Sequence, residues 1–173
     1  MLFRSLDRRR ALWEVQQLHG HSLPLLDSLP QQSSATVIPA APPALDVGQD
    51  YAAVGLSLKA HPVSFIRKEL CAKGVITAAQ VKDAKRTPTG RFVTVAGIVL
   101  FRQRPGTAKG VMFMTIEDET GRADLIVRPQ IYERYRNAAV YAGLVLVRGK
   151  IERQGGVVHV LASALEEIGR AHV

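Results

Sequence analysis

Five short segments with the pattern of β-strands lie close together between residues 91 and 165. They read RFVTVAGIVL, VMFMTIED, ADLIV, LVLVRGKIE and VVHVLASAL. Glycine and polar residues separate most of them, as expected for short strands joined by turns. Between the third and fourth segments, Ile131, Tyr135 and Ala138 recur at helical spacing and would share one face of a helix. This region therefore predicts three strands, a helix and two more strands.

That order of elements is typical of the OB-fold, a small Greek-key barrel. The predicted fold class is an all-β core with flanking helices, built on a five-stranded OB-fold barrel. In this fold, the face of the second and third strands commonly binds oligonucleotides or oligosaccharides. Gly97 interrupts the first segment and predicts a bend or a bulge at a barrel corner. The turn before Gly121 and the pair Gly155-Gly156 predict two hairpins.

Alternation within the second segment predicts which of its side chains fill the core. Met112, Met114 and Ile116 share one face of the strand, and we expect them to be buried. Phe113 and Thr115 share the opposite face. Because an aromatic residue in a strand often packs in a core, burial of Phe113 under a helix is the alternative to its exposure.

The composition changes along the chain and predicts four parts. We expect an N-terminal amphipathic helix, a flexible linker rich in proline, alanine and serine, helical segments that support the barrel, and the OB-fold domain. In that order, these parts are residues 1–30, 31–54, 55–88 and 89–168. The first helix would carry Arg8, Arg9 and Arg10, which either contact phosphates or are simply solvated.

The segment before the barrel has clear helix signals. Pro62 suits the first position of a helix, and Gly74 is placed to end it. Thr77 and Gln80 have the spacing of a capping box, which predicts a second short helix. These helices are too short to bury a core of their own, so we expect them to pack against the barrel.

Charge and cysteine content limit the partners and the compartment. The net charge of +8 favours an acidic partner such as nucleic acid, with scattered solubilising charges as the alternative. The single cysteine, Cys71, cannot form an internal disulfide, which fits a reducing compartment. No apolar run approaches the ~20 residues that span a bilayer, and the N-terminus lacks a secretory signal. We therefore expect a cytoplasmic location and no membrane partner.

A basic loop, residues 101–110, follows the first predicted strand. It contains Arg102, Arg104 and Lys109 and no acidic residue. Residues 91–164 contain eleven Lys and Arg against six Asp and Glu, a local excess of five positive charges. Such a loop attracts backbone phosphates, and Phe113 beside it offers a ring on which a base can stack. We therefore expect single-stranded nucleic acid as the partner.

Further positions complete the predicted nucleic-acid-binding site. They are polar or basic residues of the barrel region: Thr115, Arg128, Arg148 and Arg153. Each of these arginines, taken singly, would serve equally as a solubilising surface charge. His159 alternates with valines in the fifth strand, and we expect a structural or solvent-facing role for it.

Signals for catalysis or metal binding are weak. Glu117, Asp118 and Glu119 form an acidic cluster, but consecutive side chains at a strand end diverge, whereas a magnesium site needs convergent carboxylates. The segment GTAKG lacks the spacing of a phosphate-binding loop and precedes a strand instead of a helix. The sequence therefore predicts no catalytic residue, no metal and no cofactor in this chain.

Several segments resemble one family of enzymes. The most specific is VAGIVLFRQRPGTAKGVMFMTIEDETG, and LDRRRALWEV and GLSLKAHPVSFIR add to it. Together they resemble the C-terminal region of the bacterial error-prone family C DNA polymerases, paralogues of the replicative DNA polymerase III alpha subunit. That region comprises the end of a helix-hairpin-helix part, a linker and an OB domain. Met1 lies within what would be a longer reading frame in that family, which leaves a fragment and a truncated gene both open.

The resemblance implies a function. In that family the OB domain is assigned to template or single-strand binding, and the enzyme extends primers across damaged template during induced mutagenesis. The matching positions are Arg102, Arg104, Lys109 and Phe113, and related anticodon-binding OB domains stack a base on an aromatic residue at the Phe113 position. Arg128 stands where tryptophan is expected, and the catalytic domains of the polymerase have no counterpart here. The implied role is a non-catalytic module for single-stranded DNA in translesion synthesis, with a protein-docking OB domain of a mutagenesis complex as the alternative.

Overall fold

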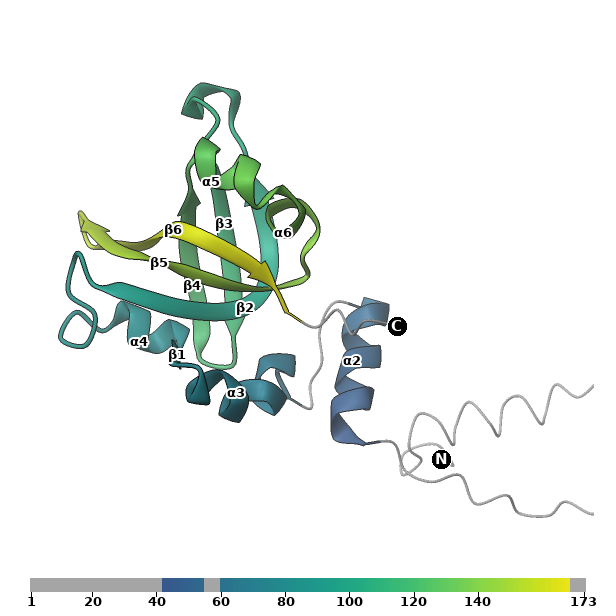
Figure 1. The fold of residues 1–173 in the computed structure, drawn as a ribbon. Coiled ribbons are helices and arrows are strands. Elements are labelled where there is room, and N and C mark those ends of the chain that lie inside the picture. Colours follow the sequence, from purple (N-terminus) through teal and green to yellow (C-terminus); the bar gives the residue numbers. More distant parts are fainter. Residues whose placement is uncertain (1–41, 55–59, 169–173) are drawn as a thin grey trace, which may run out of the picture.

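In the computed structural model, which describes residues 42–54 and 60–168, a closed β-barrel is flanked by helices (Figure 1). Within these residues the strands are β1 (Val75–Ile76), β2 (Phe92–Gln103), β3 (Met112–Asp118), β4 (Gly121–Val127), β5 (Leu144–Gln154) and β6 (Val157–Glu167). The helices are α2 (Pro43–Val54), α3 (Pro62–Ala72), α4 (Ala78–Lys82), α5 (Pro129–Arg134) and α6 (Arg136–Tyr141), with a 3₁₀ turn, η1, at Gly106–Ala108. The predicted N-terminal helix and its three arginines lie outside the described residues.

Strands β2 to β6 close into the predicted OB-fold barrel. Among the residues described, the strand order is β1-β2-β3-β4-β6-β5, and β5 pairs again with β2 to close the ring. Strand β2 pairs along one half with β5 and along the other with β3. Strands β4 and β6 run parallel to each other, while the other neighbours in the ring are antiparallel. This is the Greek-key arrangement expected from the sequence.

Strand β2 carries a bulge at Leu100. Val99 pairs with Ile116 and Phe101 pairs with Thr115, so Leu100 is an extra residue on β2. A bulge of this kind shifts the inward and outward alternation of the following side chains by one residue. The irregularity that the sequence suggested at Gly97 therefore lies further along the strand, at Leu100.

Gly97 serves a different purpose, the close approach of two strands. A Cβ atom placed at Gly97 would lie 2.6 Å from the backbone oxygen of Glu117 on β3. That distance is shorter than any ordinary carbon–oxygen contact. The missing side chain therefore lets β2 and β3 cross at this point of the barrel.

Both predicted hairpins are present. Gly121 begins β4 directly after the turn that follows β3, and its φ is 138°. Gly155 and Gly156 join β5 to β6 with φ values of 58° and 83°. Two successive positive φ values are typical of the type I′ turn, which glycine adopts at little cost.

The barrel interior is filled by apolar side chains from each of its strands. Met112, Met114 and Ile116 are buried in it, as the alternation predicted. Leu125 of β4 and Val147 of β5 pack in the same cluster. Burial of this apolar surface is the main stabilising contribution to such a fold.

The segment between β4 and β5 forms two short helices, so the prediction of a single helix is wrong. Tyr135, which separates α5 from α6, has a φ of −116°, outside the helical range. Ile131, Tyr135 and Ala138 nevertheless pack together against the core, as their spacing predicted. The break bends the segment over the end of the barrel, where Tyr132 of α5 and Ala139 of α6 are both buried.

The second half of the predicted linker is helical, which corrects the expectation for residues 31–54. Pro43 occupies the first turn of α2, and Asp46 also lies in that turn. Both residues favour a helix start, because proline needs no backbone N–H there and an acidic side chain suits the positive end of the helix dipole. Val47 is fully buried, and α2 packs against α3. The amino-acid composition of the segment does not reveal this helix, because proline and aspartate favour a helix only at its first turn.

The two helices predicted before the barrel are present. Pro62 is the first residue of α3, and Gly74 follows that helix with a φ of 74°. The side chains of Thr77 and Gln80 form the predicted capping box at the start of α4. Both helices lie beside the barrel end that carries the β3–β4 turn, whereas α5 lies at the other end (Figure 1).

Helix α3 covers part of the outer surface of the barrel. Its Val63 and Leu70 form a second apolar cluster with Ala96 of β2 and Leu146 of β5. Helix α3 therefore shields the middle of the outer β2–β5 surface from solvent. Phe92, at the start of β2, is 72% exposed. None of the described helices is long and apolar enough to cross a membrane.

Candidate functional site

Two phenyl rings lie near each other on the outward face of the barrel. Phe113 of β3 is 38% exposed and Phe101 of β2 is 48% exposed. Phe101 pairs with Thr115 and Phe113 pairs with Gln103, so the two phenylalanines are diagonal neighbours on adjacent strands. Residues in that relation lie about 7–8 Å apart. We call these two rings the aromatic platform. The sequence left open whether Phe113 is exposed or buried under a helix, and in the structure it is exposed.

Sequence reasoning missed Phe101 because of the bulge. Val93 and Val95 point into the core, and simple alternation from them would place Phe101 inward and Arg102 outward. The extra residue Leu100 reverses this order, so Phe101 faces outward. A bulge depends on the pairing between two strands, and β2 alone gave no reliable signal of its position.

Because of the same bulge, the side chain of Arg102 turns away from the exposed surface of the basic loop. Its Nε donates to the carbonyl of Ala139 at 2.7 Å, and its Nη2 donates to the carbonyl of Ala142. Burial lowers the pKa of Arg102 from its ordinary value. The expectation that Arg102 contacts phosphate is therefore replaced by a structural role, in which the guanidinium binds the C-terminal carbonyls of α6.

Two other cations of the basic loop lie at the surface. The guanidinium carbon of Arg104 lies 4.3 Å from the ring centroid of Tyr132, and its Nη2 is 4.0 Å from a carboxylate oxygen of Glu133. Lys109 is exposed and has a left-handed backbone, with φ 49°. The loop joins Gln103, the partner of Phe113, to β3, so both cations lie near the edge of the aromatic platform.

Thr115 lies on the predicted outward face but is buried. Its hydroxyl donates to the Oδ1 atom of Asp124 on the neighbouring strand at 2.6 Å. His159 of β6 pairs in register with Asp124, and its Nδ1 atom is buried without a hydrogen-bond partner among the residues described. The sequence suggested that Thr115 contacts nucleic acid. Its hydroxyl proton is already donated to Asp124, so a direct contact of this hydroxyl with nucleic acid is disfavoured.

The remaining predicted arginines lie in three different places. Arg128 is exposed at the end of β4, two positions after Ile126, whose backbone partner is Phe113. Arg148 is exposed on β5, where it pairs with Thr94 of β2 and so lies away from β3. The Arg153 guanidinium is held by backbone carbonyls of the α4 region, those of Val81, Lys82 and Thr87, and by the Thr87 hydroxyl. Arg153 therefore supports the fold, and of the three only Arg128 stands beside the aromatic platform.

The acidic cluster at the β3–β4 turn serves the fold. Asp118 and Glu119 converge on Arg67 of α3, in contrast to the divergence expected from the sequence, while Glu117 pairs with Arg122. The Arg67 cation between the two converging carboxylates offsets one of their two negative charges. Among the described residues, no group of three or more His, Cys, Asp or Glu side chains is arranged to hold a metal ion.

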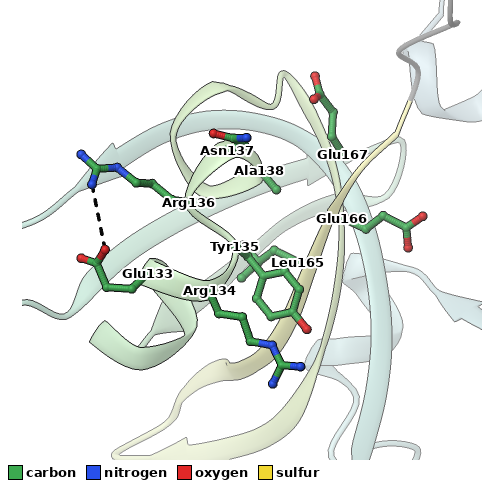
Figure 2. Close-up of a pocket in the computed structure, with 9 residues that line it drawn as sticks. All are labelled: Glu133, Arg134, Tyr135, Arg136, Asn137, Ala138, Leu165, Glu166 and Glu167. Carbon is green, nitrogen blue, oxygen red and sulfur yellow. Dashed lines mark ion pairs between the residues drawn. The ribbon is translucent and has the colours of Figure 1, made fainter.

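A pocket of about 430 Å³ opens between the helical segment and the end of β6 (Figure 2). Tyr135 and Leu165 lie at its centre, and the guanidinium carbon of Arg134 is 5.7 Å from the Tyr135 ring centroid. Its charged lining residues are three acids and two bases: Glu133, Glu166, Glu167, Arg134 and Arg136. This mixture of charges is poorly suited to a polyanion, in contrast to the surface around the aromatic platform.

The surface around the aromatic platform combines the two features that unpaired nucleic acid requires. Exposed rings can stack bases, and nearby cations can neutralise phosphates. Arg104 and Lys109 are exposed on the loop that leads into β3, and Arg128 is exposed two residues after Ile126, the partner of Phe113. Asp124 is an acidic residue on the same face. The rings lie on the paired strands β2 and β3, and the cations lie on the loop between these strands and at the end of β4, which favours defined binding geometry.

The barrel matches a known family of domains. Residues 93–168 match the tRNA_anti-codon family, described as an OB-fold nucleic acid binding domain. The matched segment begins at the second residue of β2 and ends just after β6, so it covers the barrel except Phe92.

Nearly the whole chain is similar to DNA polymerases. It is 47% identical over 176 residues to error-prone DNA polymerase 1 of Rhizobium meliloti (strain 1021), which covers 96% of this chain and 16% of that protein. It is 44% identical over 180 residues to the error-prone DNA polymerase of Rhodopseudomonas palustris (strain ATCC BAA-98 / CGA009), covering 97% of this chain and 15% of that protein. The chain thus spans about a sixth of the length of these relatives. Among solved structures, asparaginyl-tRNA synthetase from Pyrococcus horikoshii aligns with 54% of this chain and 23% of its own, at 25% identity and a TM-score of 0.44.

Proposed function

Since the chain carries an OB-fold nucleic acid binding domain and is homologous over 96% of its length to error-prone DNA polymerases, we propose that it binds single-stranded DNA. The bases stack on the aromatic platform, and the phosphates lie near Lys109, Arg104 and Arg128. In this proposal the chain contributes binding only, without catalysis.

One observation carries the proposal: Phe101 and Phe113 are both exposed on adjacent strands of the barrel. Neighbouring exposed rings form a contiguous apolar patch, and such patches often mark binding sites. Bases are suitable ligands, because every base has a flat face and stacking on an aromatic side chain contributes about 1–3 kcal/mol. The cations of the neighbouring loop add an electrostatic attraction that does not depend on the base sequence.

We further infer a role within a larger polymerase. The relatives are named as error-prone DNA polymerases, and a module that holds the unpaired template would suit extension across damaged DNA. Such a role belongs to damage-induced mutagenesis and translesion synthesis. A protein-docking role within a mutagenesis complex is the less favoured alternative, since exposed rings beside cations match unpaired nucleic acid directly.

A binding titration tests the proposal. Fluorescence anisotropy with a labelled oligothymidine should give saturable binding to the wild-type chain, and Phe113→Ala should weaken it by about 5- to 150-fold, the equivalent of one lost stacking contact. Phe65→Ala is the matched control, because Phe65 is a similarly exposed phenylalanine on α3. Equal affinities for the wild type and Phe113→Ala would reject the site.

A further inference from the structure

The strand register joins Phe113 to a second exposed phenylalanine, Phe92. Phe113 pairs with Ile126, Ile126 with Leu161, Leu161 with Lys150, and Lys150 with Phe92. This register row crosses β3, β4, β6, β5 and β2 in turn. Each step between neighbouring strands is about 4.8 Å, so the row extends for about 19 Å around the barrel.

The side chains of this register row face outward. Their neighbours along the strands, Leu125, Ile151 and Val160, are buried in the core, and alternate residues point to opposite faces. Ile126 and Leu161 are half-buried, whereas the other three members of the row are exposed. The row therefore has an aromatic ring at each end. Between the rings lie the apolar side chains of Ile126 and Leu161 and the cation of Lys150.

The far end of the row has its own pocket. Phe92, Arg91 and Arg148 line a pocket of about 340 Å³ that contains no acidic residue. One Arg91 nitrogen donates to the carbonyl of Arg86, and Arg148 is exposed. We call this the Phe92 pocket. It pairs an exposed ring with two guanidinium groups, which suits a nucleotide carrying a phosphate.

Charges on the two sides of the register row differ in sign. Arg128 and Arg148 lie two residues from Ile126 and Lys150 on one side. On the other side, Asp124 pairs with His159, which in turn pairs with Glu152. A strand laid along the row would keep its phosphates on the arginine side, away from the carboxylates.

We propose that the Phe92 pocket is a second nucleotide subsite, reached by a single-stranded DNA that stacks on Phe113 and crosses β4, β6 and β5. This inference rests on the proposed function and defines its site size. At the 3.4 Å spacing of stacked B-DNA, about six nucleotides span the row. Arg148, which the sequence had assigned to the site around Phe113, acts here at the Phe92 pocket.

The test compares two oligothymidines by fluorescence anisotropy, one of four and one of twelve nucleotides. The shorter cannot occupy both rings when stacked, whereas the longer can. Phe92→Ala should weaken binding of the twelve-nucleotide DNA by about 5- to 150-fold, but that of the four-nucleotide DNA by no more than about two-fold. Arg148→Gln should reduce the salt slope for the longer DNA by about 1.

The outcomes separate this inference from the proposed function. If Phe113→Ala weakens binding of both lengths while Phe92→Ala leaves the twelve-nucleotide affinity unchanged, the subsite is rejected and the proposed function stands. If the wild-type chain binds neither DNA, both are rejected. Phe65→Ala again serves as the matched control, and thermal melting of each variant verifies that the barrel is intact.

Discussion

Arg67 of α3 and Asp118 at the end of β3 form a partly buried ion pair, with Nη2 and Oδ2 2.9 Å apart. The Asp118 side chain, 2% exposed, also accepts hydrogen bonds from the backbone N–H of Ala78 and from Thr120. Burial acts to lower the pKa of Arg67, but the hydrogen bond and charge of Glu119 and the charge of Asp118 outweigh it, so that pKa is raised. The Asp118 carboxylate therefore links the barrel to α3 through Arg67 and to α4 through Ala78.

Asp118→Ala should destabilise the chain by about 2–4 kcal/mol, somewhat less than the removal of one partner of a fully buried ion pair, because Arg67 is partly exposed. The buried N–H of Ala78 would also lose its acceptor. Urea unfolding followed by circular dichroism measures the change. Arg122→Ala is the matched control: it removes an exposed ion pair with Glu117 and should cost no more than about 1 kcal/mol. Similar losses in both variants would contradict the assignment.

Gly97→Ala should destabilise the barrel by about 1–3 kcal/mol, as for an overpacked interior. The added methyl group would meet the backbone of Glu117, which cannot move without separating β2 from β3. Gly143→Ala provides the comparison, since a Cβ there meets no atom within 4 Å. We expect that variant to unfold within about 0.5 kcal/mol of the wild type. A Gly97→Ala chain as stable as Gly143→Ala would disprove the close approach.

His61 should make stability depend on pH near neutrality. Its Nδ1 accepts from the backbone N–H of Val63 at the start of α3, which requires the neutral ring. Burial lowers the pKa of His61 below 6.5, although the carboxylates of Glu117, Glu119 and Asp118 partly oppose the shift.

The unfolded chain therefore binds more protons than the folded chain at pH values between the lowered pKa and about 6.5. The stability from neutral His61 is complete above pH 6.5 and is lost as the pH falls through the folded-state pKa. His61→Asn keeps a capping side chain that does not titrate. Melting curves from pH 5 to 8 should show the wild type losing stability relative to His61→Asn only on the acidic side. A difference in Tm that is constant over this range would refute the linkage.

Arg102 and Arg128 should respond differently to substitution, although both were predicted to bind nucleic acid. Arg102→Met removes donors from the carbonyls of Ala139 and Ala142 and should lower stability by about 1–3 kcal/mol, without changing the salt slope of DNA binding. Arg128→Gln should leave stability nearly unchanged and reduce that slope by about 1. Anisotropy titrations at several salt concentrations, with thermal melting in parallel, measure both quantities. The assignments would be reversed if Arg102→Met alone altered the slope.

Local patterns in the sequence determined most of the fold. The period of two in β3 identified Met112, Met114 and Ile116 as core, because adjacent residues of a strand point to opposite faces. Glycines in the turns and the capping box at Thr77 depend only on neighbouring residues, so they too could be recognised. The order of these elements was enough to predict a five-stranded OB-fold barrel.

Tertiary structure decided which of the predicted site residues face a ligand. The bulge at Leu100 turns Phe101 outward and Arg102 inward, and its position is set by pairing with β3. Arg153 is held by carbonyls near α4, and Arg148 lies beside Thr94 on another part of the barrel. The sequence gives the charge of each arginine, but the partner of each depends on contacts between segments far apart in the chain. Those contacts exist only once the barrel has closed.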